Sequence, residues 1–140
     1  MLTRNEALKL IKDRIKNGNL IKHSLAVESI MKKMAIYFNQ DENTWSLAGL
    51  LHDIDYEQTK NSPFEHSRLG SQILKELGLP ESITQAVLVH NEIHNLPRRS
   101  LLDKCLYVVD PVTGLITAAT LVLPSKKLND LSVESISKRL

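Results

Sequence analysis

The chain has 140 residues, of which 42% are hydrophobic and 24% are charged, and its formal net charge is +2. This is the length of one ordinary domain and the composition of a globular protein, which excludes a disordered chain. Because the charge is small, and Lys and Arg are spread over several segments, nucleic-acid binding is not expected.

The N-terminal sequence MLTRNEALKLIKDR has charged residues throughout and no apolar core, so it does not resemble a secretory signal. We see no apolar run that approaches the roughly 20 residues needed to cross a bilayer. A cytoplasmic protein without a membrane partner is therefore expected. Cys105 is the single cysteine, which excludes an internal disulfide and a thiolate zinc site. We expect Cys105 to be a small buried hydrophobe.

Helical periodicity begins at the N-terminus. Thr3 and Glu6 form a capping-box pattern before apolar residues at helical spacing, and Asn17-Gly18 ends this first helix. Gly78 is a further stop signal, and Pro80 suits a first helical turn. Further helices are predicted at about Leu20–Phe38, Glu42–His52, Glu65–Leu77 and Pro80–Glu92.

The last apolar segment begins near Ser100, and the missing N–H of Pro111 is expected to kink or interrupt it before it continues over 114–123. Loops are expected at 54–63 and 93–99. No alternation of period two is convincing, so the fold class is all-α, a single-domain bundle of about six to seven helices over residues 1–140. The chain ends within a helical pattern, which suggests a shortened C-terminus.

Most histidines fall on the apolar faces of these helices. His23 is spaced one, two and three turns before apolar residues of the second helix, so its side chain is expected to point inward. By the same spacing His52, His66 and His90 are predicted to be buried. His94 lies outside this pattern and is expected to be an exposed loop residue.

Two aspartates share this placement. Asp53 follows His52 directly, and Asp110 closes an apolar run before Pro111. A buried carboxylate without a cation costs several kcal/mol, and no Lys or Arg occupies a matching inward position. A single inward histidine is more often a hydrogen-bonded core residue than a ligand. Six such side chains from five helical segments instead favour a metal ion, because inward ligands from separate helices meet in a bundle.

The ordered motif consists of His23, then Leu-Leu-His52-Asp53-Ile-Asp55-Tyr56, then Glu65-His66-Ser-Arg-Leu-Gly70, then His90, then Asp110-Pro-Val-Thr-Gly114-Leu-Ile. It resembles the HD-domain superfamily of metal-dependent phosphohydrolases, in particular its small stand-alone bacterial members, and the resemblance covers about residues 20–120. The resemblance implies a bundle of the HD-domain type with its metal site between helices.

The resemblance also implies the ligands. His23, His52, Asp53 and Asp110 correspond to those of a first metal ion, and Asp53 is placed to bridge to a second. In members with two metals, further histidines match His66 and His90. Some relatives have a His-His pair at the latter position, where this chain reads His90-Asn91. One or two divalent ions per chain are therefore expected, and Fe, Mn, Zn, Ni and Mg are not distinguishable.

Other residues are candidates for catalysis and substrate binding. Asp53, as the bridging ligand, and Asp55 are the catalytic candidates; Asp55 would either accept a proton from water on the metal or hold a ligand histidine in its tautomer, the alternative being a solvated loop residue. Candidate phosphate contacts near the ligands are Lys22, Arg68, Arg98 and Arg99.

The expected function is metal-dependent hydrolysis of a phosphate ester of a small metabolite or nucleotide by a metal-activated water. Relatives that cleave cyclic dinucleotides read His-Asp-Ile-Gly-Lys, whereas residues 52–56 read His-Asp-Ile-Asp-Tyr. The missing lysine argues against cyclic dinucleotides. The alternative is a degenerate, non-catalytic HD module that binds metal and a ligand or partner as a regulator. Homodimer formation is compatible with a small helical domain.

Overall fold

The computed structural model describes residues 1–139, all of them helical or in turns and connecting segments. Six helices have nine residues or more, and they match the six that the sequence predicts, which confirms the all-α class. Their bounds are α1 Arg4–Arg14, α2 Gly18–Tyr37, α3 Glu42–Leu51, α5 Arg68–Glu76, α6 Glu81–His90 and α7 Leu101–Leu121. The shorter elements are α4 Tyr56–Thr59, α8 Val133–Ser137 and the 3-10 turns Glu92–His94 and Leu128–Asp130.

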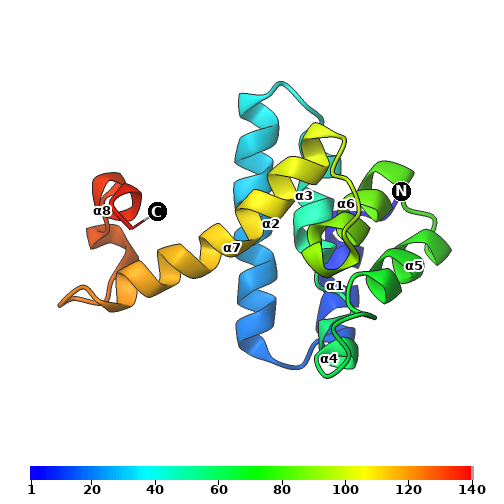
Figure 1. Ribbon diagram of the computed structural model, residues 1–140, viewed down its shortest axis with the longest axis horizontal. Coiled ribbons are helices and arrows are strands. Elements are labelled where there is room, and N and C mark those ends of the chain that lie inside the picture. Colours follow the sequence, from blue (N-terminus) through cyan, green and yellow to red (C-terminus); the bar gives the residue numbers. More distant parts are fainter. Residues whose placement is uncertain (140) are drawn as a thin grey trace.

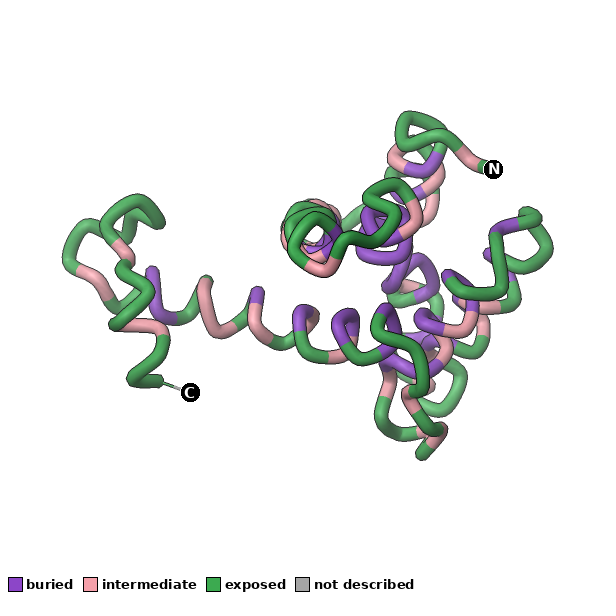
Figure 2. Tube along the Cα trace, turned by 90° about the horizontal axis from the view of Figure 1, so that it is seen from above, coloured by how far each residue is buried: buried purple, intermediate pink, exposed green. Residues whose placement is uncertain are grey.

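Helix α2 is the central element of the bundle. In Figure 1 it crosses the middle of the molecule, with α1 and α3–α6 on one side of it, while α7 passes across it and carries α8 away from the other helices. The buried residues in Figure 2 gather where these helices meet, and the segment that ends in α8 is mostly exposed. The fully buried apolar side chains include Ile11, Ile15, Val27, Met31, Leu47, Leu50, Leu51, Ile54, Leu74, Ile83 and Leu106.

A glycine sets the distance between α2 and α3. A Cβ atom on Gly49 would lie 3.0 Å from the backbone N and Cα of Glu28 on α2, so only a residue without a side chain allows this approach. Glu28 is buried, and Arg4 of α1 neutralises it through a two-pronged salt bridge with an Nη2–Oε2 distance of 2.9 Å. These contacts fix α1 and α3 on α2 and thereby place His23 opposite His52.

The structure differs from the sequence prediction at several helix boundaries. The expected loop at 54–63 contains α4, and the first two residues of the expected loop at 93–99 belong to the 3-10 turn Glu92–His94. Helix α5 begins at Arg68 and not at Glu65, because Ser67 has a left-handed backbone with φ 69°. The helical pattern expected to reach the C-terminus ends with α8 at Ser137, and Leu140 lies outside the described residues.

Helix α7 runs through Pro111 without a break. The expected interruption is therefore wrong, and the alternative of a kink stays a prediction. Pro111 lies on the exposed side of the helix, where water can replace the backbone hydrogen bond that proline lacks. Among the described residues, α7 is also the one helix that is long and apolar enough to cross a membrane. The sequence prediction did not find this run because Asp103, Lys104 and Asp110 interrupt it. Length and composition alone carry this finding: mostly buried core helices of soluble proteins pass the same test, and 28% of the apolar window of α7 is buried.

Candidate metal centre

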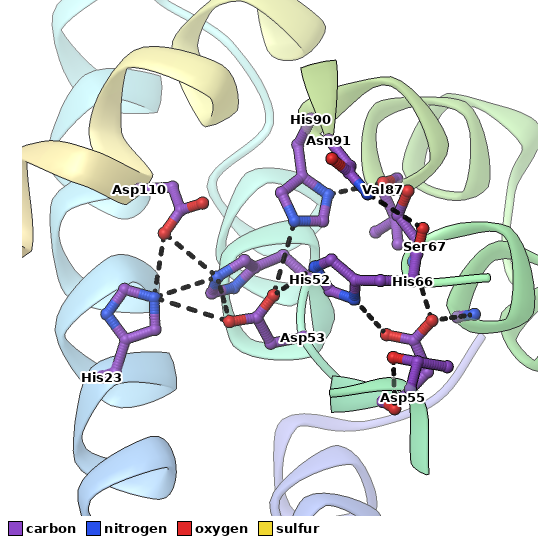
Figure 3. Close-up of polar contacts among 12 residues, drawn as sticks. His23, His52, Asp53, Asp55, His66, Ser67, Val87, His90, Asn91 and Asp110 are labelled. Atoms are coloured by element: carbon purple, nitrogen blue, oxygen red, sulfur yellow. Dashed lines mark hydrogen bonds and ion pairs between the residues drawn. The ribbon is translucent and has the colours of Figure 1, made fainter. Parts of the chain in front are cut away.

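Six side chains from separate elements converge between α2, α3, α6 and α7 (Figure 3). His23 comes from α2, His52 caps α3, and Asp53 follows it. The remaining three come from the segment before α5, the last turn of α6 and the middle of α7. We call the six residues the HD cluster: His23, His52, Asp53, His66, His90 and Asp110. Two groups of three within the cluster, His23–His52–Asp110 and His52–Asp53–His90, have ligand atoms within 4.8 Å of one another.

The orientation of two imidazoles is fixed by backbone carbonyls. The Nδ1 atom of His52 lies 2.7 Å from the carbonyl oxygen of Gly49, and Nδ1 of His90 pairs in the same way with Val87. A carbonyl oxygen only accepts, so each Nδ1 carries the proton. The Nε2 atoms of both rings then face the cluster.

The other two imidazoles reach the same state through side chains. His66 donates its Nδ1–H to Oδ1 of Asp55 at 2.9 Å. The hydroxyl of Thr113 donates to the carbonyl oxygen of Asp110, so it accepts from Nδ1 of His23, 2.9 Å away. All four rings therefore keep their Nδ1–H bonded outside the cluster and direct Nε2 toward it, and Nε2 is the atom that would bind a metal ion once it has lost any proton.

Asp53 divides the HD cluster into two halves. Its Oδ2 lies 3.2 Å from Nε2 of His52 and 3.7 Å from Nε2 of His23, and Asp110 completes this half with Oδ1 2.9 Å from His23. The Oδ1 atom of Asp53 faces His66 and His90, whose Nε2 atoms both lie 3.4 Å away. One carboxylate thus contacts two separate sets of nitrogen atoms, as a bridging ligand would.

Opposite charges in the HD cluster shift its pKa values. Burial lowers the pKa of His52, but Asp53 and Asp110 outweigh this effect and hold it well above its usual value. Burial likewise lowers the pKa of His66, while hydrogen bonds to Asp53 and Asp55 raise it to about 9. Burial raises the pKa values of Asp53 and Asp110, but the histidines bring both below the ordinary range. In the metal-free protein, protons therefore supply the positive charge that the carboxylates require.

The donor set fits a divalent metal ion. It consists of imidazole nitrogens and carboxylate oxygens, which suit borderline and hard ions and leave Fe, Mn, Zn, Ni and Mg as candidates. No Lys or Arg side chain forms an ion pair with Asp53 or Asp110 in residues 1–139, so no fixed cation competes for the carboxylates. Each histidine also has the second hydrogen bond that commonly orients a metal ligand.

Asp55 supports the HD cluster from outside it. Its side chain is fully buried, and besides His66 it accepts hydrogen bonds from the backbone N–H groups of Ser67 and Gly70, each at 2.8 Å. Both oxygens are thus occupied. Of the alternatives that the sequence leaves open, this geometry favours holding a ligand histidine over accepting a proton from water, and the solvated-loop interpretation is wrong.

The four candidate phosphate contacts lie in different surroundings. Lys22 is exposed on α2, and Arg68 is exposed but donates its Nε–H to His94 at 3.1 Å. Arg98 stacks over the ring of Tyr107, with 3.5 Å from its guanidinium carbon to the ring centroid. Arg99 lies in a separate cavity with Glu81, Ser82, Gln85, Ser100 and Asp103. The structure therefore places Arg98, and not Arg99, beside a residue that borders the HD cluster.

A cavity of about 370 Å³ opens onto the HD cluster. Its walls are His66, His90, Asn91, Glu92, Tyr107, Asp110 and Pro111. The hydroxyl of Tyr107 donates to Glu92 at 3.1 Å, which places a carboxylate and a phenol opposite the ligands. The volume is that of a small-molecule site, and the polar lining suits a polar ligand.

Several residues at the site were not identified from the sequence. Thr113 orients His23, and Asn91 donates to the carbonyl oxygen of His66 at 3.2 Å. His94, expected to be exposed, is half-buried, and its Nε2 lies 2.7 Å from that same oxygen. Their roles depend on contacts between distant elements, for which the sequence gives no periodic signal. Of the four histidines predicted to be buried, His23 and His66 are half-buried, because they lie at the rim of the HD cluster.

The chain matches known proteins over this same region. Residues 20–114 match the family model of the HD domain. The chain is 30% identical over 128 residues to Ribonuclease Y of Oleidesulfovibrio alaskensis, covering 86% of this chain and 24% of that protein. Ribonuclease Y of Nitratidesulfovibrio vulgaris is 29% identical over 116 residues, covering 81% and 22%, and that of a Nitratiruptor species is 36% identical over 80 residues, covering 57% and 15%.

The chain thus spans less than a quarter of the length of these curated relatives. No solved structure matches it. The family match extends from the second helix to just past Asp110 and includes all six members of the HD cluster, as the motif in the sequence implies. The chain therefore belongs to the HD domain family, a superfamily of metal-dependent phosphohydrolases.

Proposed function

We propose that this protein is a metal-dependent phosphohydrolase that cleaves a phosphate ester of a small metabolite or nucleotide. The observation that carries the proposal is the convergence of four imidazole Nε2 atoms and two carboxylates on a space between helices. The ion held there would supply an activated water and neutralise phosphoryl charge. The proposal includes a cytoplasmic location and no membrane partner, as expected from the sequence.

The protein side chains divide the remaining tasks. Asp53 spans both halves of the HD cluster and is the proposed catalytic carboxylate. Asp110, whose side chain is 30% exposed, lines the cavity together with His66 and His90, so substrate would reach the cluster on this side. Asp55, which has no exposed surface, holds His66 and is a positioning residue.

The cavity limits the size and charge of the substrate. Its lining contains Glu92 but no Lys or Arg, so a chain of several phosphates would meet no cation beyond the metal site. The pair of Tyr107 and Glu92 can instead bond hydroxyl or amino groups of a sugar or base. Arg98, stacked on Tyr107, is the nearest proposed phosphate contact. These features support a substrate with one phosphate group and a polar remainder.

RNA is the second candidate substrate. The relatives named above are Ribonuclease Y proteins, and this observation favours a phosphodiester of RNA. The net charge of +2 and the scattered basic residues favour the small substrate. A phosphodiester and a phosphomonoester present the same phosphoryl oxygens to the metal site, so the HD cluster serves either reaction.

The test uses untagged protein depleted of metal and reloaded separately with Mn²⁺, Fe²⁺, Ni²⁺, Zn²⁺ or Mg²⁺. Phosphate release is measured on nucleoside monophosphates and sugar phosphates, and cleavage is measured on a labelled RNA oligonucleotide. Asp53→Asn is the inactive control. Hydrolysis of the monoesters supports the proposal, and hydrolysis of RNA alone selects the second candidate. A metal-loaded protein that hydrolyses none of these faster than Asp53→Asn is a non-catalytic metal-binding module, and the proposal fails.

A further inference from the structure

The main-chain carbonyl of His66 is held by two side chains that follow α6. Asn91 donates its Nδ2–H to this oxygen at 3.2 Å, and Nε2 of His94 lies 2.7 Å from it. The same Nε2 lies 3.0 Å from the hydroxyl of Ser67. Since a carbonyl oxygen only accepts, Nε2 of His94 must carry a proton.

Arg68 fixes the other side of the His94 ring. Its Nε–H donates to Nδ1 of His94 at 3.1 Å, and because a guanidinium has no acceptor, this Nδ1 must be unprotonated. His94 therefore has the tautomer opposite to that of the four histidines in the HD cluster. With this tautomer the ring donates to the carbonyl oxygen of His66 and accepts from Arg68, so it links the two residues that flank Ser67.

Ser67 requires such support. It is a buried non-glycine residue with φ 69°, a backbone conformation that persists only where the surroundings determine it. Its N–H donates to Asp55 at 2.8 Å, and its hydroxyl donates to the carbonyl of Leu88 on α6 at 3.0 Å. This peptide directs His66 toward Oδ1 of Asp53, 3.4 Å from its Nε2.

We propose that His94, fixed by Arg68, is a positioning residue for the metal centre and acts on one half of it. It holds the His66–Ser67 peptide and thereby sets the half that consists of His66, His90 and Oδ1 of Asp53. The half formed by His23, His52 and Asp110 has no contact with this peptide among the hydrogen bonds and ion pairs of residues 1–139. The inference rests on the proposed metal centre, and it reassigns Arg68 from phosphate contact to partner of His94.

Three variants separate positioning from general support. His94→Gln keeps an N–H donor for His66 and an oxygen acceptor for Arg68, whereas His94→Leu keeps the bulk and loses both. Asn95→Gly is the matched control, because Asn95 is the exposed neighbour with φ 50° and glycine accepts that backbone. Circular dichroism and thermal melting establish that each variant is folded.

Mn²⁺ titration of the metal-free proteins by calorimetry, with electron paramagnetic resonance to detect coupled ions, gives the first measurement. Wild type is expected to bind two ions. His94→Leu should weaken one of the two steps by about 10- to 100-fold, the usual effect of removing a partner of a metal ligand, and leave the other step within about twofold. His94→Gln and Asn95→Gly should resemble wild type. Equal weakening of both steps, no change, or a single step in wild type overturns the inference.

Hydrogen exchange of the metal-free protein gives a measurement that needs neither metal nor activity. The amide of Ser67 is bonded to Asp55 and should exchange at least about tenfold faster in His94→Leu, with recovery in His94→Gln. If wild type binds no Mn²⁺, the proposed function fails, and this experiment still decides whether His94 holds the peptide. Unchanged exchange in His94→Leu overturns the positioning role.

Discussion

The Nε2 atoms of His23 and His52 lie 3.1 Å apart, although each ring donates its Nδ1 proton to another partner. Two nitrogen lone pairs that face each other repel, so a proton or a cation must lie between them. In the metal-free protein a proton lies between the two nitrogens, and the neighbouring carboxylates of Asp53 and Asp110 favour the protonated state of His52. His23 and His52 would hold a metal ion through these two nitrogens in place of the proton.

The first prediction concerns metal content. Untagged wild-type protein purified without chelator should carry one or two divalent ions per chain, and His52→Ala or Asp53→Ala should lose them, because both residues lie at the centre of the HD cluster. Elemental analysis measures this. At a free metal concentration of about 100 times Kd, binding should add about 2.7 kcal/mol to the free energy of unfolding. Asp130→Ala removes an exposed carboxylate outside the cluster and is the control; metal-free wild type that also refuses added ions contradicts the prediction.

The second prediction concerns pH. The folded-state pKa of His66 is raised to about 9 from its ordinary value of 6.5, so its contribution to stability is complete below about pH 6.5 and is lost as pH rises through 9. Urea unfolding of metal-free protein in EDTA should therefore show falling stability across this window, and His66→Gln should reduce the slope. Metal affinity should rise over the same window, since ligand histidines must lose their protons. Stability that increases from pH 6.5 to 9 without metal would falsify this assignment.

The third prediction tests the approach of α2 and α3. Gly49→Ala should lower the free energy of unfolding by about 2 kcal/mol, because its Cβ would meet the backbone of Glu28 at 3.0 Å. Gly114→Ala is the matched control: nothing lies within 4 Å of its Cβ, and alanine in an exposed helix should stabilise by about 0.5–1 kcal/mol. Chemical denaturation of both variants gives the two values. Equal effects of the two substitutions would show that the helices do not depend on this contact.

The fourth prediction concerns Asp55. Asp55→Asn replaces a carboxylate that accepts three hydrogen bonds by an amide with one acceptor oxygen, so either a buried N–H loses its partner or His66 must take the other tautomer and turn a protonated Nε2 toward the cluster. The expected loss is about 3 kcal/mol in the free energy of unfolding, measured by urea titration. Asp13→Asn, at an exposed position, should change it by less than about 0.5 kcal/mol. A neutral Asp55→Asn would mean that Asp55 does not hold His66.

The fifth prediction separates two adjacent arginines. In metal-loaded enzyme, Arg98→Ala should raise KM by about tenfold, because Arg98 stacks on Tyr107 at the cavity and a charged hydrogen bond to phosphate is lost. Arg99→Ala should leave KM within about twofold, since Arg99 borders a different cavity. Steady-state kinetics on the same substrate compares them. A larger rise in KM for Arg99→Ala than for Arg98→Ala would place the phosphate near Arg99 and contradict the prediction.

Periodicity accounts for what could be predicted from the sequence. Histidines on apolar helix faces, and aspartates in apolar runs, are visible as exceptions to a regular pattern, so the six members of the HD cluster and the six longer helices could be recognised. The structure brings all six side chains together, and the family match covers them.

The supporting contacts could not be predicted in the same way. Thr113, His94 and the left-handed Ser67 occupy positions without a periodic exception, and their hydrogen bonds join segments far apart in the sequence. The continuity of α7 through Pro111 depends on solvent at the exposed side of that helix, which only the packed structure defines. Secondary-structure propensity depends on a residue and its neighbours in the sequence, whereas these hydrogen bonds and the exposure of Pro111 depend on segments that pack together from elsewhere in the chain.

The path of α7 across α2 has a consequence for folding. His23 and Asp110 come from helices that are far apart in the sequence but in contact in the fold, and Nε2 of His23 lies 2.9 Å from Oδ1 of Asp110. An ion held by both would cross-link the second helix to the seventh and restrict the unfolded ensemble, as a disulfide does for a long loop. In a chain whose one cysteine can form no internal disulfide, the ion would be a cross-link between distant segments, and chelation should loosen the contact of α7 with α2.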